Sequence, residues 1–152
     1  MFTKFEIMSK SANEMIRFFF LSKTITLRNR KRLKLFLVRL IRTEGFRIAD
    51  INIIFCSDHY LLKINRSYLK HDFYTDIVTF PLSANGEALQ AEIYISTERV
   101  KENASKLGVT INSEIHRVIF HGLLHLCGYS DKTTKAKQTM RNKESEYLFQ
   151  YL

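Results

Sequence analysis

The sequence is poor in several residue types and segments that would define other classes of protein. It has no tryptophan, a single proline (Pro81) and two widely separated cysteines. Cys56 and Cys127 do not have the spacing of a zinc finger, and we expect both to be reduced, buried apolar residues. No stretch approaches the ~18 consecutive apolar residues of a membrane-spanning helix, and the first residues lack the basic-then-apolar order of a signal peptide. We therefore expect a cytoplasmic protein that does not enter a membrane.

Basic charge, in contrast, is abundant and unevenly distributed. The chain of 152 residues holds 24 lysines and arginines against 15 acidic residues, a net charge of +9. Residues 28–42, RNRKRLKLFLVRLIR, contain seven basic residues and no acid. Apolar residues recur within this segment at helical spacing, at Leu33, Phe36, Leu37, Leu40 and Ile41. The pattern predicts a helix that packs on the core, ends near Gly45 and presents a cationic face formed by Arg28, Arg30, Lys31, Arg32, Lys34, Arg39 and Arg42.

Three interpretations of this cationic face remain open from sequence. A solvated surface is the default for a run of charge, although seven unneutralised like charges repel one another. A nucleic-acid backbone would neutralise them directly. A membrane surface ranks third, because the apolar stripe is the kind that a small domain needs for its own core. Nucleic acid is therefore the partner that we expect.

The rest of the chain alternates strand and helix patterns. Strands are predicted at 15–20, 47–56, 75–82 and 91–96, the last two as a hairpin around Asn85 and Gly86, with Pro81 at a strand end or sheet edge. Helices are predicted after Ser57 and Asp58, with Leu61, Ile64 and Tyr68 inward, and from a cap at Thr97 to Gly108, with Val100, Ala104 and Leu107 inward. Residues 69–74 read as a loop. The sequence thus predicts one α/β (α+β) domain over residues 1–152, with a mixed sheet of about four strands and flanking helices.

The segment HGLLHLCGYSDK, residues 121–132, contains the residues most suited to a chemical function. It lies at the end of a helix predicted from about Ile111 to Cys127 that is apolar all round from Val118 onward, which is typical of a buried central helix. His121 and His125 are one turn apart on one face of that helix. Gly128 can reverse the chain and bring Asp131 back toward them.

Three such ligands with one open position are typical of a catalytic zinc site, and the alternative is a pair of hydrogen-bonded core histidines. Gly122 stands where the glutamate base of a His-Glu-x-x-His metalloprotease would be. This substitution disfavours a peptide hydrolase.

Three motifs resemble the YbeY family of bacterial endoribonucleases. HGLLHLCGY is similar to the family signature His-Gly-x-x-His-Leu-x-Gly-Tyr, and NRSYLKHDFYTDIVTFP and AEIYIS are similar to two upstream blocks in the same order. The resemblance implies a single-strand-specific, metal-dependent endoribonuclease that acts in 16S ribosomal RNA maturation and ribosome quality control. It also implies one Zn²⁺ per chain, ribosomal RNA and the small ribosomal subunit as partners, and no dinucleotide cofactor.

Two departures from the family pattern matter for the site, one at Ser130 and Asp131 and one at Leu69; Ser130 stands where the family has an aspartate. Asp131 stands where the family has its third histidine ligand, so the predicted metal set is His121, His125 and Asp131. This set is more anionic and admits manganese or iron beside zinc. Leu69 stands where the family has a substrate-contacting arginine, a charge that Lys70 or Arg66 would have to supply.

The catalytic group implied by the resemblance is a metal-bound water, with support from Lys70 and Asp76. The ordinary alternatives are a solvated loop lysine at Lys70 and a strand-entry hydrogen bond at Asp76. If Asp131 faces solvent, then His59, His71 or His116 would have to complete the ligand set. Two other functions also fit the sequence: a non-catalytic ribosome-associated factor with a structural metal, and a metallo-hydrolase acting on another substrate.

Overall fold

The centre of the fold is a mixed four-stranded sheet. The structure, a computed structural model, describes residues 15–152. The strands are β1 (Ile16–Phe20), β2 (Ile48–Cys56), β3 (Ile77–Pro81) and β4 (Leu89–Ser96), in the order β1-β2-β4-β3. β1, β2 and β4 run parallel, and β3 is the antiparallel edge strand that forms the hairpin with β4. The predicted α/β class and mixed sheet are confirmed, and Pro81 ends an edge strand, where a missing N–H donor is tolerated.

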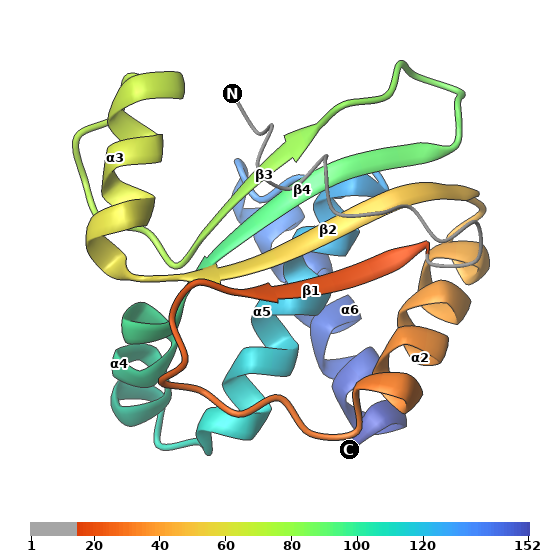
Figure 1. The fold of residues 1–152 in the computed structure, drawn as a ribbon. Helices are drawn as coiled ribbons and strands as arrows, with labels where there is room; N and C mark the ends of the chain where they lie inside the picture. Colours follow the sequence, from red (N-terminus) through yellow and green to blue (C-terminus); the bar gives the residue numbers. More distant parts are fainter. Residues whose placement is uncertain (1–14) are drawn as a thin grey trace.

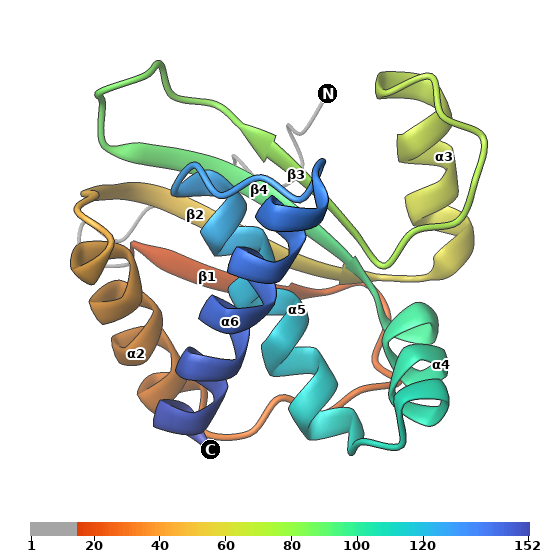
Figure 2. The ribbon, with the colours of Figure 1, turned by 180° about the vertical axis from the view of Figure 1, so that it is seen from behind.

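Within residues 15–152, five helices cover the two faces of this sheet unequally (Figures 1 and 2). α2 (Arg30–Thr43), α5 (Ile111–Leu126) and α6 (Thr134–Tyr151) lie on one face, with α4 (Thr97–Leu107) beside α5, and α3 (Asp58–Tyr68) lies on the other. β2 shows why both faces need cover. Its side chains at Ile51, Ile53 and Phe55 join the core under α2, α5 and α6, whereas Ile54 and Cys56 join the smaller core under α3.

The predicted basic helix forms as α2, and its apolar stripe is fully confirmed. Leu33, Phe36, Leu37, Leu40 and Ile41 are all buried. The helix stops as expected at Gly45, which takes a left-handed φ of 90°. Six of the seven basic side chains are exposed and Lys34 is half-buried, so the cationic face does point outward.

α5 is the buried central helix that the sequence predicted. Its N-cap is Thr110, whose side chain accepts a hydrogen bond from the Ser113 backbone N–H. Gly122 lets the helix approach the sheet closely, because a Cβ there would lie 2.7 Å from Ile77 Cδ1 and 3.3 Å from Ile93 Cγ2. The histidines on either side of this glycine are thereby brought over the edge of the sheet that β3 forms.

Three details of the helix predictions are wrong. Tyr68 does not face inward but is 46% exposed in the last turn of α3, with its ring packed edge-on against Phe80. Leu107 does not face inward either: it is the last residue of α4, before the Gly108 cap, and is 61% exposed. The N-cap of α4 is Ser96 rather than Thr97, since the Ser96 hydroxyl accepts from the Arg99 N–H.

Two further expectations agree with the structure. Cys56 and Cys127 are buried free thiols. No helix within residues 15–152 combines the length and the apolar character that crossing a membrane requires. The extent of the domain over residues 1–14 stays a prediction, because that part lies outside the described residues.

Candidate metal centre

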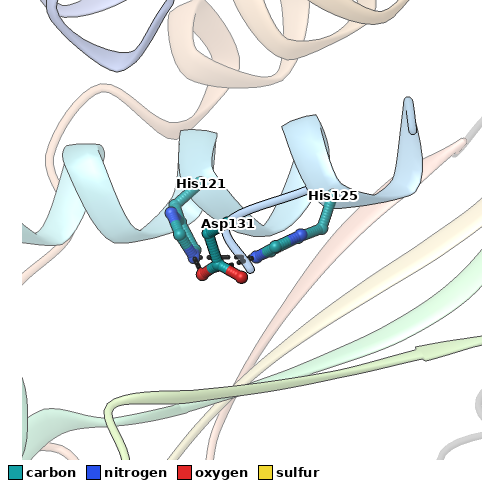
Figure 3. A group of neighbouring side chains, drawn as sticks. All are labelled: His121, His125 and Asp131. Atoms are coloured by element: carbon teal, nitrogen blue, oxygen red, sulfur yellow. Dashed lines mark hydrogen bonds and ion pairs between the residues drawn. The ribbon is translucent and has the colours of Figure 1, made fainter. Parts of the chain in front are cut away.

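Two imidazoles and one carboxylate converge at the end of α5 (Figure 3). The Nε2 atoms of His121 and His125 are 3.0 Å apart, and Asp131 Oδ2 lies 3.7 Å and 3.4 Å from them, respectively. One potential ligand atom from each residue falls within 4.8 Å of the others. The chain reversal that makes this possible occurs at Gly128, which has a φ of 95° and donates to the His125 carbonyl. The structure therefore brings together the three residues predicted as metal ligands.

The other ring nitrogen of each histidine is held by the protein. His125 Nδ1 donates to the Tyr129 carbonyl oxygen at 2.8 Å, and His121 Nδ1 faces Glu144 Oε2 at 3.4 Å. A proton on each Nδ1 leaves the lone pair of each Nε2 directed toward Asp131. This is the arrangement in which metal-binding histidines are usually found, with the outer nitrogen bonded to a carboxylate or a carbonyl. The donor set thus fits a divalent cation.

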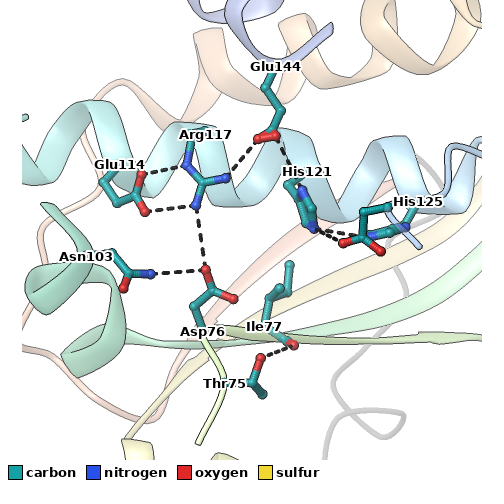
Figure 4. Close-up of polar contacts among 10 residues, drawn as sticks. Thr75, Asp76, Ile77, Asn103, Glu114, Arg117, His121, His125 and Glu144 are labelled. Atoms are coloured by element: carbon teal, nitrogen blue, oxygen red, sulfur yellow. Dashed lines mark hydrogen bonds and ion pairs between the residues drawn. The ribbon is translucent and has the colours of Figure 1, made fainter. Parts of the chain in front are cut away.

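Behind His121 lies a buried network of charge that the sequence analysis missed (Figure 4). Arg117 bonds to both oxygens of Glu114 at 2.6 and 2.9 Å, and its Nη1 donates to Glu144 Oε1 at 2.8 Å. Glu114 and Glu144 are 1% and 4% exposed. Arg117 lies four residues before His121, so helical spacing could have placed it near the site, but Glu144 comes from α6 and gave no local signal.

The Arg117 guanidinium lies between two buried glutamates, and these groups shift one another's pKa. Burial opposes the ionisation of Glu144, but hydrogen bonds from His121 and Arg117 outweigh it and lower its pKa. The neighbouring carboxylates raise the pKa of Arg117 above its ordinary value despite its partial burial, with Glu114 contributing most. The lowered pKa of Glu144 therefore favours a negative charge next to His121 Nδ1.

Asp76 meets the same network from the opposite side. Its Oδ2 accepts from Asn103 Nδ2 at 3.2 Å and lies 3.6 Å from Arg117 Nη2. Burial raises the pKa of Asp76, and Arg117 partly counteracts that effect. Its backbone carbonyl also accepts from the Ser96 N–H, which is the strand-entry bond expected from sequence. Asp76 thus has both a structural contact and a carboxylate facing the site.

The convergent residues open into a cleft of about 890 Å³. Its walls are the edge strand β3, the loop between α3 and β3, and the end of α5 with the segment that follows it, and its lining includes Asp76, His121, His125 and Asp131. Lys70 is exposed in the loop with a φ of 54° and does not line the cleft. Leu69 does line it, and Arg66 instead forms an ion pair with Asp72. The support by Lys70 stays a prediction.

The three alternative third ligands lie elsewhere or farther off. His59 is exposed on α3, and the buried His116 bonds through Nδ1 to the Asn112 carbonyl. His71 lines the cleft but is not in the group of ligand atoms formed with Asp131.

The cationic face of α2 is separate from the cleft. None of its seven basic residues lines the cleft, which lies at the β3 edge of the sheet, whereas Arg30 and Lys34 stack over Phe20 and Phe18 of the opposite edge strand β1. Arg32 stacks over the Tyr151 ring, with 4.2 Å between Arg32 Cζ and the ring centroid, and donates to the Tyr151 carbonyl. Part of the face is therefore held by aromatic contacts, while Arg28, Lys31 and Arg42 are exposed.

Together, the fold and the site define a class: an α/β protein with a two-histidine, one-aspartate group suited to a metal ion in a surface cleft. Comparison with known proteins gives the family. The profile described as "Endoribonuclease YbeY" matches residues 21–152, and the chain belongs to the YbeY family.

Individual relatives agree with this assignment. "Endoribonuclease YbeY" of Cytophaga hutchinsonii is 48% identical over 132 residues, which cover 86% of this chain and 92% of the relative. The protein of the same name from Christiangramia forsetii is 49% identical over 110 residues, covering 72% and 76% of the two chains. The solution structure of TM1509 from Thermotoga maritima is similar with a TM-score of 0.61 and 30% identity, over 88% of this chain and 86% of that one.

Proposed function

We propose that this protein is a metal-dependent endoribonuclease that cleaves single-stranded RNA during ribosomal RNA processing. The observation that carries the proposal is the convergence of His121, His125 and Asp131 in an open cleft of a chain that belongs to the YbeY family. Its relatives bear the name of endoribonucleases, which hydrolyse phosphodiester bonds within RNA.

The cofactor we propose is one Zn²⁺ per chain, held by the two Nε2 atoms and the Asp131 carboxylate. A zinc ion in such a site polarises a phosphoryl oxygen and lowers the pKa of a water molecule. The protein contributes the orientation of both imidazoles through the Tyr129 carbonyl and Glu144. Asp76 lies where it can accept a proton or a hydrogen bond from a group in the cleft.

The partners we propose are ribosomal RNA of the small subunit, 16S in bacteria, and the cytoplasmic ribosomal particle that contains it. The support is the cationic face of α2, which would neutralise phosphates outside the cleft.

The test of this partner reverses the charge of Lys31 and Arg42, a choice that avoids the residues of α2 that stack on aromatic rings. Each phosphate contact to a single strand contributes ~0.7 to the steepness of log affinity against log salt concentration. If Lys31 and Arg42 each contact one phosphate, the double variant should therefore have a slope that is shallower by about 1.4.

The control for this experiment reverses Lys135 and Lys137 on α6, which changes the net charge equally. An equal loss of affinity in both double variants would mean that the effect is that of net charge alone. An unchanged salt slope in the Lys31 and Arg42 variant would leave α2 as a solvated face.

Cleavage itself is tested with protein purified without a histidine tag, stripped of metal and reloaded with zinc. Single-stranded RNA should be cut only after reloading, and His125→Ala should abolish both metal binding and cleavage while the protein remains folded by circular dichroism. A casein substrate should remain intact, because Gly122 replaces the metalloprotease glutamate and Ile77 fills the adjoining space.

The competing functions predict other results. A folded protein that binds zinc stoichiometrically but leaves every RNA intact would be a non-catalytic factor with a structural metal. Hydrolysis of another substrate without RNA cleavage would assign the site to a different hydrolase.

A further inference from the structure

An exposed aromatic residue lies in the wall of the metal-site cleft, in the segment that the sequence predicts to be a loop. Phe73 is 56% exposed and lines the cleft that also contains His121, His125 and Asp131. A phenylalanine that is half uncovered in a folded protein forgoes much of the free energy of burial, which is about 25 cal/mol per Å² of apolar surface. Its position within the cleft, rather than elsewhere on the surface, gives that exposure a functional meaning.

The loop that carries Phe73 is held in place by a buried amide. Asn65 of α3 is 1% exposed, and its Nδ2 donates to the Phe73 carbonyl at 2.9 Å. The Asn65 backbone carbonyl accepts from the His71 N–H at 3.1 Å. The His71 ring stacks on the Phe73 ring, with 5.2 Å between centroids and 20° between planes. Two flat rings are thus presented from a fixed backbone.

The charges of the cleft show which part of an RNA strand these rings would contact. Among the described residues that line the cleft, Lys132 is the only lysine or arginine, whereas Asp76 and Asp131 are acidic. The basic side chains of the cleft therefore offer few phosphate contacts to a strand. Stacking of bases on aromatic rings is the other common source of affinity for single strands, and it does not depend on base identity.

Resting on the proposed function, we infer that Phe73, backed by His71, is the surface on which an unpaired RNA base stacks while the adjoining phosphodiester reaches the metal-site residues. Selection for single strands follows from this contact. A base inside a duplex is already stacked between its neighbours and must leave the helix to present its face to a protein ring. Phe73 is thus a specificity-determining residue for the same cleft.

The test uses zinc-loaded protein and a short single-stranded oligonucleotide that the enzyme cannot cut and that contains 2-aminopurine, a base whose fluorescence is quenched by stacking. Wild-type protein should quench the probe. Phe73→Leu should weaken binding about tenfold, within the range measured for the loss of a base–aromatic stack, and should reduce the quenching, whereas Phe73→Tyr should preserve both. Phe149→Leu is the matched control, because Phe149 is 90% exposed on α6 and does not line the cleft.

Zinc binding by Phe73→Leu should equal that of the wild type, which shows that the metal group is intact. Wild-type affinity and quenching in Phe73→Leu, or no quenching by wild-type protein, would overturn the inference. Failure of the proposed function looks different: wild-type protein would quench the probe in a manner dependent on Phe73 and yet leave RNA uncut after zinc loading. That result would support the stacking surface and contradict the endoribonuclease.

Discussion

Glu144 should set the metal affinity of a site that it does not directly join. It is 4% exposed on α6, and its two oxygens are divided between Arg117 Nη1, at 2.8 Å, and His121 Nδ1, at 3.4 Å. The substitution Glu144→Gln keeps the shape of the side chain and removes its charge. The amide oxygen can still accept one hydrogen bond, but the carboxylate that faces His121 Nδ1 and orients the ring is lost.

The magnitude follows from the geometry of these two contacts. Loss of an outer partner of a metal-binding histidine costs about 10–100-fold in metal affinity. Because the His121 contact is long for a hydrogen bond, we expect the lower end, about tenfold. Arg117 keeps its two bonds to Glu114, so no unpaired buried cation results. The free energy of unfolding should fall by about 1.5–3 kcal/mol, the value of a hydrogen bond to a charged group.

Glu114→Gln separates the two effects, because Glu114 belongs to the same network without contacting His121. Competitive titration of zinc against a chelator measures the affinity, and urea unfolding of the metal-free proteins measures the stability. Both variants should lose stability, but only Glu144→Gln should lose the tenfold in affinity. An equal fall in zinc affinity for both, or affinity within about threefold of wild type for Glu144→Gln, would refute the role of Glu144 in orienting the imidazole.

Three other predictions follow from individual contacts. Asp131→Asn should weaken zinc binding at least tenfold, because it removes the anionic member of the ligand group, and Asp131→His should restore it; zinc titration checks both, and unchanged affinity in Asp131→Asn would return Asp131 to an ordinary turn residue. Burial opposes the ionisation of Glu44, but bonds from Tyr147, Tyr129 and Lys143 lower its pKa below the ordinary 4.5. The ionised carboxylate therefore stabilises the fold above pH 4.5, and this stabilisation is lost as the pH falls through the lowered pKa. Glu44→Gln should lower the free energy of unfolding by ~2 kcal/mol at pH 7, and this difference should shrink in unfolding curves measured below pH 4.5. A difference that does not change with pH would contradict the prediction. Burial raises the pKa of the Cys56 and Cys127 thiols to about 12, so both should react with a thiol reagent only after denaturation, and rapid labelling of the native protein would show that one of them is accessible.

The sequence predicted those elements whose signals are local. The stripe of α2 repeats over several turns, so one misplaced residue could not obscure it, and all five stripe positions are buried. The errors fall at helix ends. Tyr68 and Leu107 have the correct spacing for inward positions, but each is the last residue of its helix and remains 46% and 61% exposed, respectively. Spacing gives the direction of a side chain, not whether a packing partner extends that far.

The residues of the candidate site also fall into two groups, those with a local sequence signal and those without one. His121, His125 and Asp131 lie within eleven consecutive residues, and the turn at Gly128 is encoded locally, so the sequence could bring them together. Glu144 and Asp76 reach the site only through tertiary packing of α6 and of the loop before β3. A single glutamate in the polar helix α6 does not differ, in sequence, from its exposed neighbours.

The distribution of charge in the cleft has a consequence for how metal and RNA bind. Without a cation, Asp131 and Asp76 face the cleft, Glu144 lies behind His121, and Lys132 is the only lysine or arginine in the lining among residues 15–152. A phosphate entering it meets net repulsion, and a divalent cation on the ligand group reverses the sign of that interaction. Metal and RNA should therefore bind cooperatively. Linkage requires each ligand to raise the affinity for the other by the same factor, which corresponds to a coupling free energy of typically 1–3 kcal/mol. Zinc titration with and without a single-stranded oligonucleotide that the enzyme cannot cut measures one side of this cycle, and oligonucleotide titration with and without zinc measures the other. If the zinc affinity is the same with and without the oligonucleotide, and the oligonucleotide affinity is the same with and without zinc, the strand does not pass the group formed by His121, His125 and Asp131. That result would contradict the assignment of the cleft as the site of cleavage.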